Sequence, residues 1–226
     1  MIENLLKVFQ KDNLFTQAMG ECHTMLDLDW TMYEKSTQSL RHSDTGDLDL
    51  DMVATDKRIN AYERDVRRKV MTHLAVSGAP DIPSGLVLVT VVIDIERIGD
   101  YTKNIYELAR SHPKRLQAGS LEARLHETEM GVTQLFKDMI QAFKTNDEDL
   151  ARRIMTGYKE GLSAACETIT MDVVSATVTD LPSADAATVA LYARYLKRIA
   201  AHSRNIVTSI VNPFHRIGYR EKPETI

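Results

Sequence analysis

Two carboxylates stand four residues apart in an otherwise apolar stretch of this chain. They are Glu96 and Asp100, within the run Asp-Ile-Glu-Arg-Ile-Gly-Asp-Tyr at residues 94–101. Side chains at this spacing lie one above the other on a helix, so two oxygen donors would project side by side. Hard divalent or trivalent cations favour such donors. Gly99 lies between them and costs a helix interior about 1 kcal/mol relative to alanine, so we expect a neighbouring helix or a ligand shell to approach the backbone there.

The elements that must position these side chains are predicted to be helices. Helical periodicity dominates the chain, and no convincing run alternates polar and apolar residues as a strand would. We expect six long helices, at about residues 14–39, from 52 to before 77, from 81 to before 113, 121–144, from 147 to beyond 173, and from 183 to 212. In the third, Glu96, Asp100 and Asn104 follow one border of the apolar stripe, where side chains are partly dry and still accessible. Asp81 is the expected N-cap of that helix.

Short matches between the two halves of the chain indicate a duplication. Arg97-Ile98 and Asn104-Ile105 recur as Arg198-Ile199 and Asn205-Ile206, at a constant offset of 101 residues. Met19-Gly20 has a counterpart in Met130-Gly131, and Asp49-Leu50 in Asp149-Leu150. Because the matches keep their order along the chain, we predict an all-α fold of two tandem, pseudo-repeated three-helix bundles, residues 1–113 and 114–226.

Composition narrows the class of protein. The chain has 226 residues, a net charge of −4 and 27% charged residues, which is typical of a soluble globular protein and not of a nucleic-acid-binding one. Its cysteines, Cys22 and Cys166, have neither zinc-ribbon nor disulfide-framework spacing, so we expect buried, reduced thiols. The N-terminus lacks the layout of a signal peptide, and no apolar run approaches the ~18 residues that span a bilayer. We therefore expect a soluble cytoplasmic protein.

The run at residues 94–100, followed by Asn104-Ile105, closely resembles the signature of the PhoU family, regulators of phosphate uptake. The resemblance implies a duplicated three-helix plan in which each half carries a Glu/Asp-x-x-x-Asp motif. In the family, these motifs hold metal ions or multinuclear metal clusters on the bundle surface. Glu96 and Asp100 match the motif on the third helix. On the second helix Asp56 matches the family's Asp-x-x-x-Asp, but Asn60 replaces its second acid and offers only a neutral carbonyl oxygen.

The second half departs from the family pattern. Lys197 stands in place of the glutamate, Ala200 in place of the glycine and Ala201 in place of the aspartate. A lysine repels a cation and alanine has no donor atom, so we expect at most one metal site, formed by Glu96, Asp100, Asp56 and Asn60. Its oxygen ligands are suited to magnesium, manganese, iron or calcium. Zinc is found in proteins of the family through adventitious loading. In addition, Ile82-Pro83 after Asp81 replaces the family's Leu-Arg, which removes a basic group.

The resemblance implies a function without catalysis: restraint of phosphate uptake and phosphate-responsive signalling. The implied partners are the ATPase subunit of a phosphate transporter and a membrane sensor kinase, with the protein a homodimer that reaches the membrane only through them. An alternative is an accessory regulator of another ion transporter with no bound metal, in which the carboxylates close salt links with Arg97, Lys103 or Lys57. A helical-bundle metalloenzyme is disfavoured because the chain has no paired Glu-x-x-His motif, His-Glu-x-x-His or phosphate loop.

Overall fold

The computed structural model of the chain describes residues 13–46, 48–77, 79–112 and 114–221, without the side chains of residues 158–160. All regular structure in this part of the chain is helical, which confirms the predicted fold class. The long elements are α2 (Leu14–His42), α3 (Met52–Ser77), α4 (Ile82–Ser111), α5 (Glu122–Thr145), α6 (Glu148–Gly157), α7 (Ala164–Val174) and α8 (Ser183–Val211). Short 3-10 turns are η1 (Ala79–Asp81), η2 (Gly119–Leu121) and η4 (Phe214–Arg216), and η3 (Tyr158–Ser163) is a π-helical turn.

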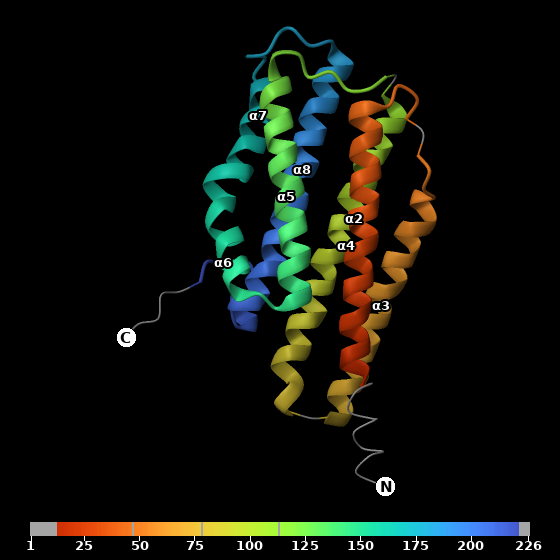
Figure 1. The fold of residues 1–226 in the computed structure, drawn as a ribbon, viewed down its shortest axis with the longest axis vertical. Helices are drawn as coiled ribbons and strands as arrows, with labels where there is room; N and C mark the ends of the chain where they lie inside the picture. Colours follow the sequence, from red (N-terminus) through yellow and green to blue (C-terminus); the bar gives the residue numbers. More distant parts are fainter. Residues whose placement is uncertain (1–12, 47, 78, 113, 222–226) are drawn as a thin grey trace.

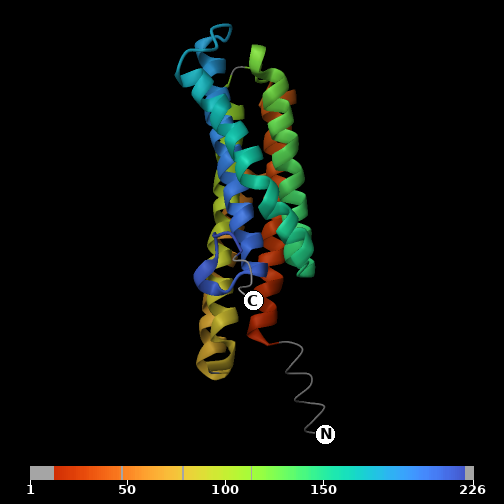
Figure 2. The same ribbon diagram turned by 90° about the vertical axis from the view of Figure 1, so that its left-hand side faces the viewer.

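The helices form an elongated bundle with two edges. Figure 1 shows α2 and α5 lying in front of α4 and α8, and the turned view in Figure 2 shows these two pairs side by side. At one edge α3 packs against α2 and α4, and at the other α6 and α7 pack against α5 and α8. Each half thus contributes one three-helix unit, as predicted, and α4 packs closely on α8 so that both units share one hydrophobic core. The predicted division at 113/114 falls on Pro113, which lies outside the described residues, as do residues 1–12 and 222–226.

Polar side chains define where several helices begin. Asn13 Oδ1 accepts the backbone N–H of Thr16 at 2.8 Å, Asp51 Oδ1 that of Ala54 at 2.9 Å, and Asp147 Oδ1 that of Leu150 at 2.9 Å. These are side-chain N-caps, each satisfying a donor that has no partner within the helix. The prediction for Asp81 was wrong in this respect. It occupies the N-cap position of α4 but makes no capping hydrogen bond, because its carboxylate pairs with His73 Nε2 at 2.8 Å.

The predicted fifth helix is not continuous. A π-helical turn at η3 divides it into α6 and α7. A π turn adds one residue to a helical turn, so it shifts the apolar stripe that a uniform spacing of three and four would predict. Periodicity alone therefore identified this segment as helical but missed the change of phase within it.

A buried polar cluster joins the two halves. Arg41 on α2 donates through Nε to Glu129 Oε2 on α5 at 3.1 Å, and its Nη2 pairs with Glu122. Tyr192 on α8 donates to the same Glu129 oxygen at 2.8 Å. Arg41, Glu129 and Tyr192 are all buried, so each needs these partners to offset its loss of water.

Two further sequence expectations concern the thiols and the membrane. Cys22 and Cys166 are free and buried, as predicted, and burial raises the pKa of each thiol to about 12. Neither is therefore a thiolate at neutral pH. Among the described residues, none of the helices combines the length and apolar composition needed to cross a bilayer.

Candidate functional site

The structure places the four residues predicted to bind metal on two adjacent helices. Asp56 and Asn60 lie on α3, and Glu96 and Asp100 lie on α4, which packs against it. The carboxylate side chains of Asp56 and Glu96 retain only 12% and 14% of their exposure, and that of Asp100 retains 33%. They line a partly dry border of the α3–α4 pair, as the apolar stripe predicted.

Basic side chains already pair with these carboxylates. Arg97 donates through Nη1 to Asp100 Oδ2 at 2.8 Å, and its Nε lies 3.6 Å from Glu96 Oε2. Lys103 Nζ donates to Asp56 Oδ2 at 3.2 Å. Two of the salt links considered from the sequence are therefore present, whereas Lys57 forms none with the described residues. Asn60 donates its amide nitrogen to the Asp56 backbone carbonyl at 3.1 Å, which leaves its amide oxygen available to a cation.

A further carboxylate, Asp29 on α2, lies directly behind this border and was not singled out from the sequence. Its side chain is fully buried, and neither oxygen has a hydrogen-bond partner among the described residues. An unpartnered buried polar group is rare in a native fold and points to a ligand, a strained state or a proton held by the carboxyl. The sequence does contain a sign of it: Asp29 is an acid at a position where the helical spacing of the buried residues Leu26 and Tyr33 predicts an apolar side chain.

Asp29 explains the glycine in the middle of α4. A Cβ atom at Gly99 would lie 2.7 Å from Asp29 Oδ1 and 3.4 Å from Ile59 Cδ1. Only a residue without a side chain lets the carboxyl sit against the α4 backbone. The close approach expected at Gly99 is therefore made by α2, through Asp29.

Negative charge accumulates around Asp29. Burial raises the pKa of Asp29 well above its ordinary value, and the charges of Glu96, Asp100 and Asp56 raise it further. Burial likewise raises the pKa of Glu96, with Asp100 adding to the effect and Arg97 opposing it. A cation between these groups would relieve both the repulsion and the burial cost. In the described part of the chain, however, no three His, Cys, Asp or Glu side chains converge closely enough to ligate one ion.

In the second half, the positive charge comes from a lysine side chain of the protein. Lys197, which stands in place of the glutamate, donates its ammonium to Glu167 on α7 at 2.7 Å. Ala200, in place of the glycine, is fully buried. The carboxylate on this side is therefore neutralised by a side chain of the protein, and the residues that replace the motif supply no ligand for a metal ion.

A polar seam between α4 and α8 borders the first-half carboxylates. His202 Nδ1 lies 2.7 Å from Asp94 Oδ1, and Arg198 Nη2 lies 3.1 Å from His202 Nε2. Because a guanidinium only donates, Nε2 must accept, and the Nδ1 proton is donated to Asp94. Arg198 also donates through Nε to the hydroxyl of Tyr101 at 3.1 Å. These contacts hold α4 against the other half of the bundle.

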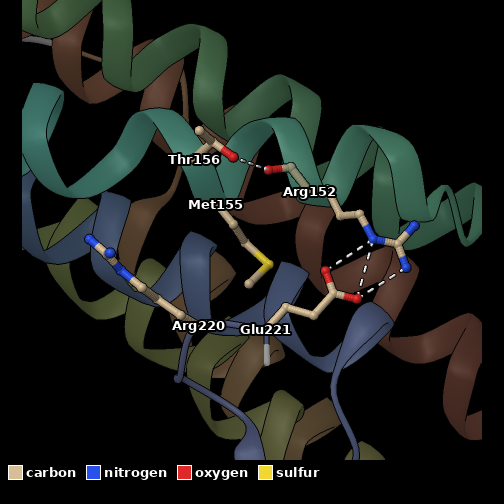
Figure 3. A pocket seen from close by; sticks show the side chains of 5 residues that line it. All are labelled: Arg152, Met155, Thr156, Arg220 and Glu221. Carbon is tan, nitrogen blue, oxygen red and sulfur yellow. Dashed lines mark hydrogen bonds and ion pairs between the residues drawn. The ribbon is translucent and has the colours of Figure 1, made fainter. Parts of the chain in front are cut away.

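A separate hollow of about 450 Å³ lies beside α6 and is shown in Figure 3. Arg152, Met155, Thr156, Arg220 and Glu221 line it. Arg152 donates through Nε to Glu221 Oε2 at 3.0 Å and through Nη2 to Glu221 Oε1 at 3.2 Å. The guanidinium therefore already holds a carboxylate of the chain itself, and we assign this hollow no function.

The contact at Gly99 leads to a first prediction. Replacing Gly99 by alanine should lower the free energy of unfolding by about 1–3 kcal/mol through overpacking against Asp29, measured by urea unfolding. Gly20 is the matched control, since a Cβ there meets nothing within 4 Å and alanine should add about 1 kcal/mol. Asp29→Ala in the Gly99→Ala background should recover most of the loss. Independent, additive effects would contradict the contact.

The raised pKa of Asp29 leads to a second prediction. In the folded state this carboxyl keeps its proton at pH values where the unfolded chain has lost it, so it makes the protein less stable as the pH rises above about 4. Asp29→Asn removes this titration, so the variant should gain stability relative to the native protein between pH 4 and pH 8. Chemical unfolding at several pH values measures the difference. Parallel pH profiles for the two proteins would show that Asp29 titrates normally.

Comparison with known proteins identifies the family. The PhoU domain model matches the chain twice, at residues 23–109 and 128–210. The crystal structure of PhoU from Pseudomonas aeruginosa superposes with a TM-score of 0.74 at 23% identity, covering 90% of this chain and 97% of that one. The phosphate transport system regulatory protein PhoU from Streptococcus pneumoniae gives 0.73 at 16% identity, covering 87% and 93%.

No curated protein matches the sequence. At these identities the two structures establish the fold alone, whereas the family model covers most of the chain and both of its repeats. This chain belongs to the PhoU family.

Proposed function

We propose that this protein regulates phosphate uptake and phosphate-responsive signalling through contacts with other proteins and without catalysis of its own. The observation that carries this proposal is the match of the PhoU domain model to both halves of the chain. The similar protein from Streptococcus pneumoniae is a regulatory protein of a phosphate transport system. The partners that fit this role are the ATPase subunit of a phosphate transporter and a membrane sensor kinase, contacted by a cytoplasmic homodimer.

The chemistry of the described residues supports a binding role. Burial keeps both thiols protonated, and Arg97 and Lys103 engage the carboxylates at the α3–α4 border. Groups neutralised in this way are poor nucleophiles and poor general bases.

We also propose one cation at Glu96 and Asp100, with Asp56 and the amide oxygen of Asn60 completing its ligands once these side chains move closer together around it. The support is the excess of carboxylates around the unpartnered Asp29. Arg97 is 52% exposed and Lys103 32% exposed, so both long side chains have room to turn into solvent when a cation replaces them. Hard oxygen donors of this kind suit magnesium, manganese, iron or calcium.

The alternative is an accessory regulator of another ion transporter with no bound metal. The Arg97–Asp100 and Lys103–Asp56 ion pairs favour it, because they already neutralise the carboxylates. In the second half, the ammonium group of Lys197 pairs with Glu167. There, a side chain of the protein supplies the positive charge that a metal ion would otherwise supply.

The regulatory role is tested by affinity purification from phosphate-replete cells. We expect the transporter ATPase subunit and the sensor kinase to be recovered with the protein, and expect deletion of its gene to leave phosphate-responsive genes active when phosphate is plentiful. Recovery of a carrier for a different ion, together with normal phosphate regulation in the deletion strain, would support the alternative and contradict this proposal.

The cation is tested separately by elemental analysis of protein purified without a histidine tag. Glu96→Ala/Asp100→Ala should lose most of the bound metal because it removes both motif carboxylates. The matched control is Glu167→Ala/Lys197→Ala, which removes the equivalent ion pair of the second half and should retain the native metal content. Equal metal in all three proteins would exclude the assigned ligands.

A further inference from the structure

The outer face of α3 is a long surface of the first half that no other described helix covers. α3 packs against α2 and α4 at one edge of the bundle (Figure 1). Its exposed charged side chains are all basic: Lys57, Arg58, Arg64, Arg67 and Arg68. We call the exposed side of Met52–Ser77 the outer face of α3. On a chain whose net charge is −4, this face is a local concentration of positive charge.

The acids of α3 are less exposed than its arginines. Asp56 is buried against α4, and Glu63 and Asp65 are partly buried and paired with basic neighbours. Arg58 and Arg64, by contrast, make no hydrogen bond or ion pair with any described residue. The two guanidinium groups therefore offer their donors to something outside this part of the chain.

A hollow of about 440 Å³ lies on the same face. Arg58, Arg64 and Arg68 border it together with Asp65 and Tyr62, and the small side chain of Ala61 also lines it. A guanidinium fork matches the geometry of phosphate oxygens and binds them with paired hydrogen bonds. Arg68 is paired with Asp65, so Arg58 and Arg64 are the groups that suit the hollow to a phosphate-bearing group.

Apolar side chains continue the outer face of α3 in both directions. Val53 is 53% exposed at the start of the helix, and Met71 and Val76 are 67% and 83% exposed towards its end. Ile82, 44% exposed, adds to them where α4 begins, and Figure 1 places this hairpin at one end of the long axis. Basic and exposed apolar side chains are the two kinds of group through which a surface helix contacts a membrane interface.

We propose that the outer face of α3 lies on an anionic lipid bilayer. The arginines bind headgroup phosphates, while Met71 and Val76 enter the boundary between headgroups and acyl chains. The apolar groups stand on the outer edge of the bundle, where they suit a flat, deformable surface better than a folded partner. This direct contact revises the expectation that the protein reaches the membrane only through partners. It depends neither on the proposed cation nor on a protein partner.

Co-sedimentation of the full-length chain with vesicles tests the proposal. Binding should be strong to vesicles of equal parts phosphatidylglycerol and phosphatidylcholine at low salt, weaker at higher salt, and negligible to pure phosphatidylcholine. Equal binding to both kinds of vesicle, or none to either, would overturn the proposal. Inorganic phosphate at millimolar concentration should compete only as well as other salts of equal ionic strength. Specific competition would identify free phosphate as the ligand and overturn the lipid assignment.

The arginines are tested by charge-matched variants. Arg58→Gln/Arg64→Gln should raise the lipid concentration at half-binding by roughly 30-fold, since each basic group near an anionic surface contributes about 1 kcal/mol. The control is Arg153→Gln/Arg194→Gln, which removes the same charge from exposed positions on α6 and α8 and should bind like the native chain. If both double variants lost vesicle binding equally, the loss would be explained by net charge alone, and this would contradict a docking face on α3.

The apolar contact has its own matched pair. Met71→Ser/Val76→Ser should weaken vesicle binding several-fold, whereas Met171→Ser/Val174→Ser, which removes exposed apolar groups of similar size from α7, should not. Light scattering of every variant gives the oligomeric state. If the α3 substitutions changed the mass of the protein and left vesicle binding intact, the face would be a contact between copies. If deletion of residues 1–12 alone abolished binding while the α3 variants bound normally, that segment would be the lipid contact instead.

Discussion

The close packing of α2 against α4 at Asp29 and Gly99 is the constraint on which the first half of the structure depends. A fully buried carboxyl touches helix backbone where any side chain would collide with it. The repulsion of Glu96, Asp100 and Asp56 and the loss of water both disfavour its charged form. The fold therefore keeps a buried carboxyl, without hydrogen-bond partners in the described part of the chain, directly beneath its acidic border, and groups with pKa values shifted in this way cluster at sites of function.

The two repeats balance the charge around the motif positions in different ways. In the first, carboxylates exceed the basic groups that face them, and this surplus is the basis of the proposed cation. In the second, Lys197 supplies the positive charge from the chain itself and Ala200 fills the place that Gly99 leaves open. One three-helix plan thus accommodates an acidic border and a self-neutralised one, and the asymmetry follows from a few substitutions on α4 and α8.

Charge is also separated across α3. Asp56 faces α4, where Lys103 pairs with it, while the exposed arginines turn toward solvent. The helix carries two of the four proposed cation ligands, Asp56 and Asn60, on its inner border and the proposed lipid contact on its outer face. Because α4 is held to α8 through Asp94, His202 and Arg198, the first half presents α3 from a base formed by both repeats.

Much of the fold could be predicted because helical periodicity is a local property. The spacing of apolar residues located the six long helices, and repeated short motifs located the duplication. Only the tertiary structure showed that Asp29 reaches Gly99, far along the chain, that Lys103 pairs with Asp56, and that a π turn divides the fifth helix. Such neighbours depend on the register in which whole helices pack, and that register is decided by the fit of many side chains at once, not by the spacing within any one segment.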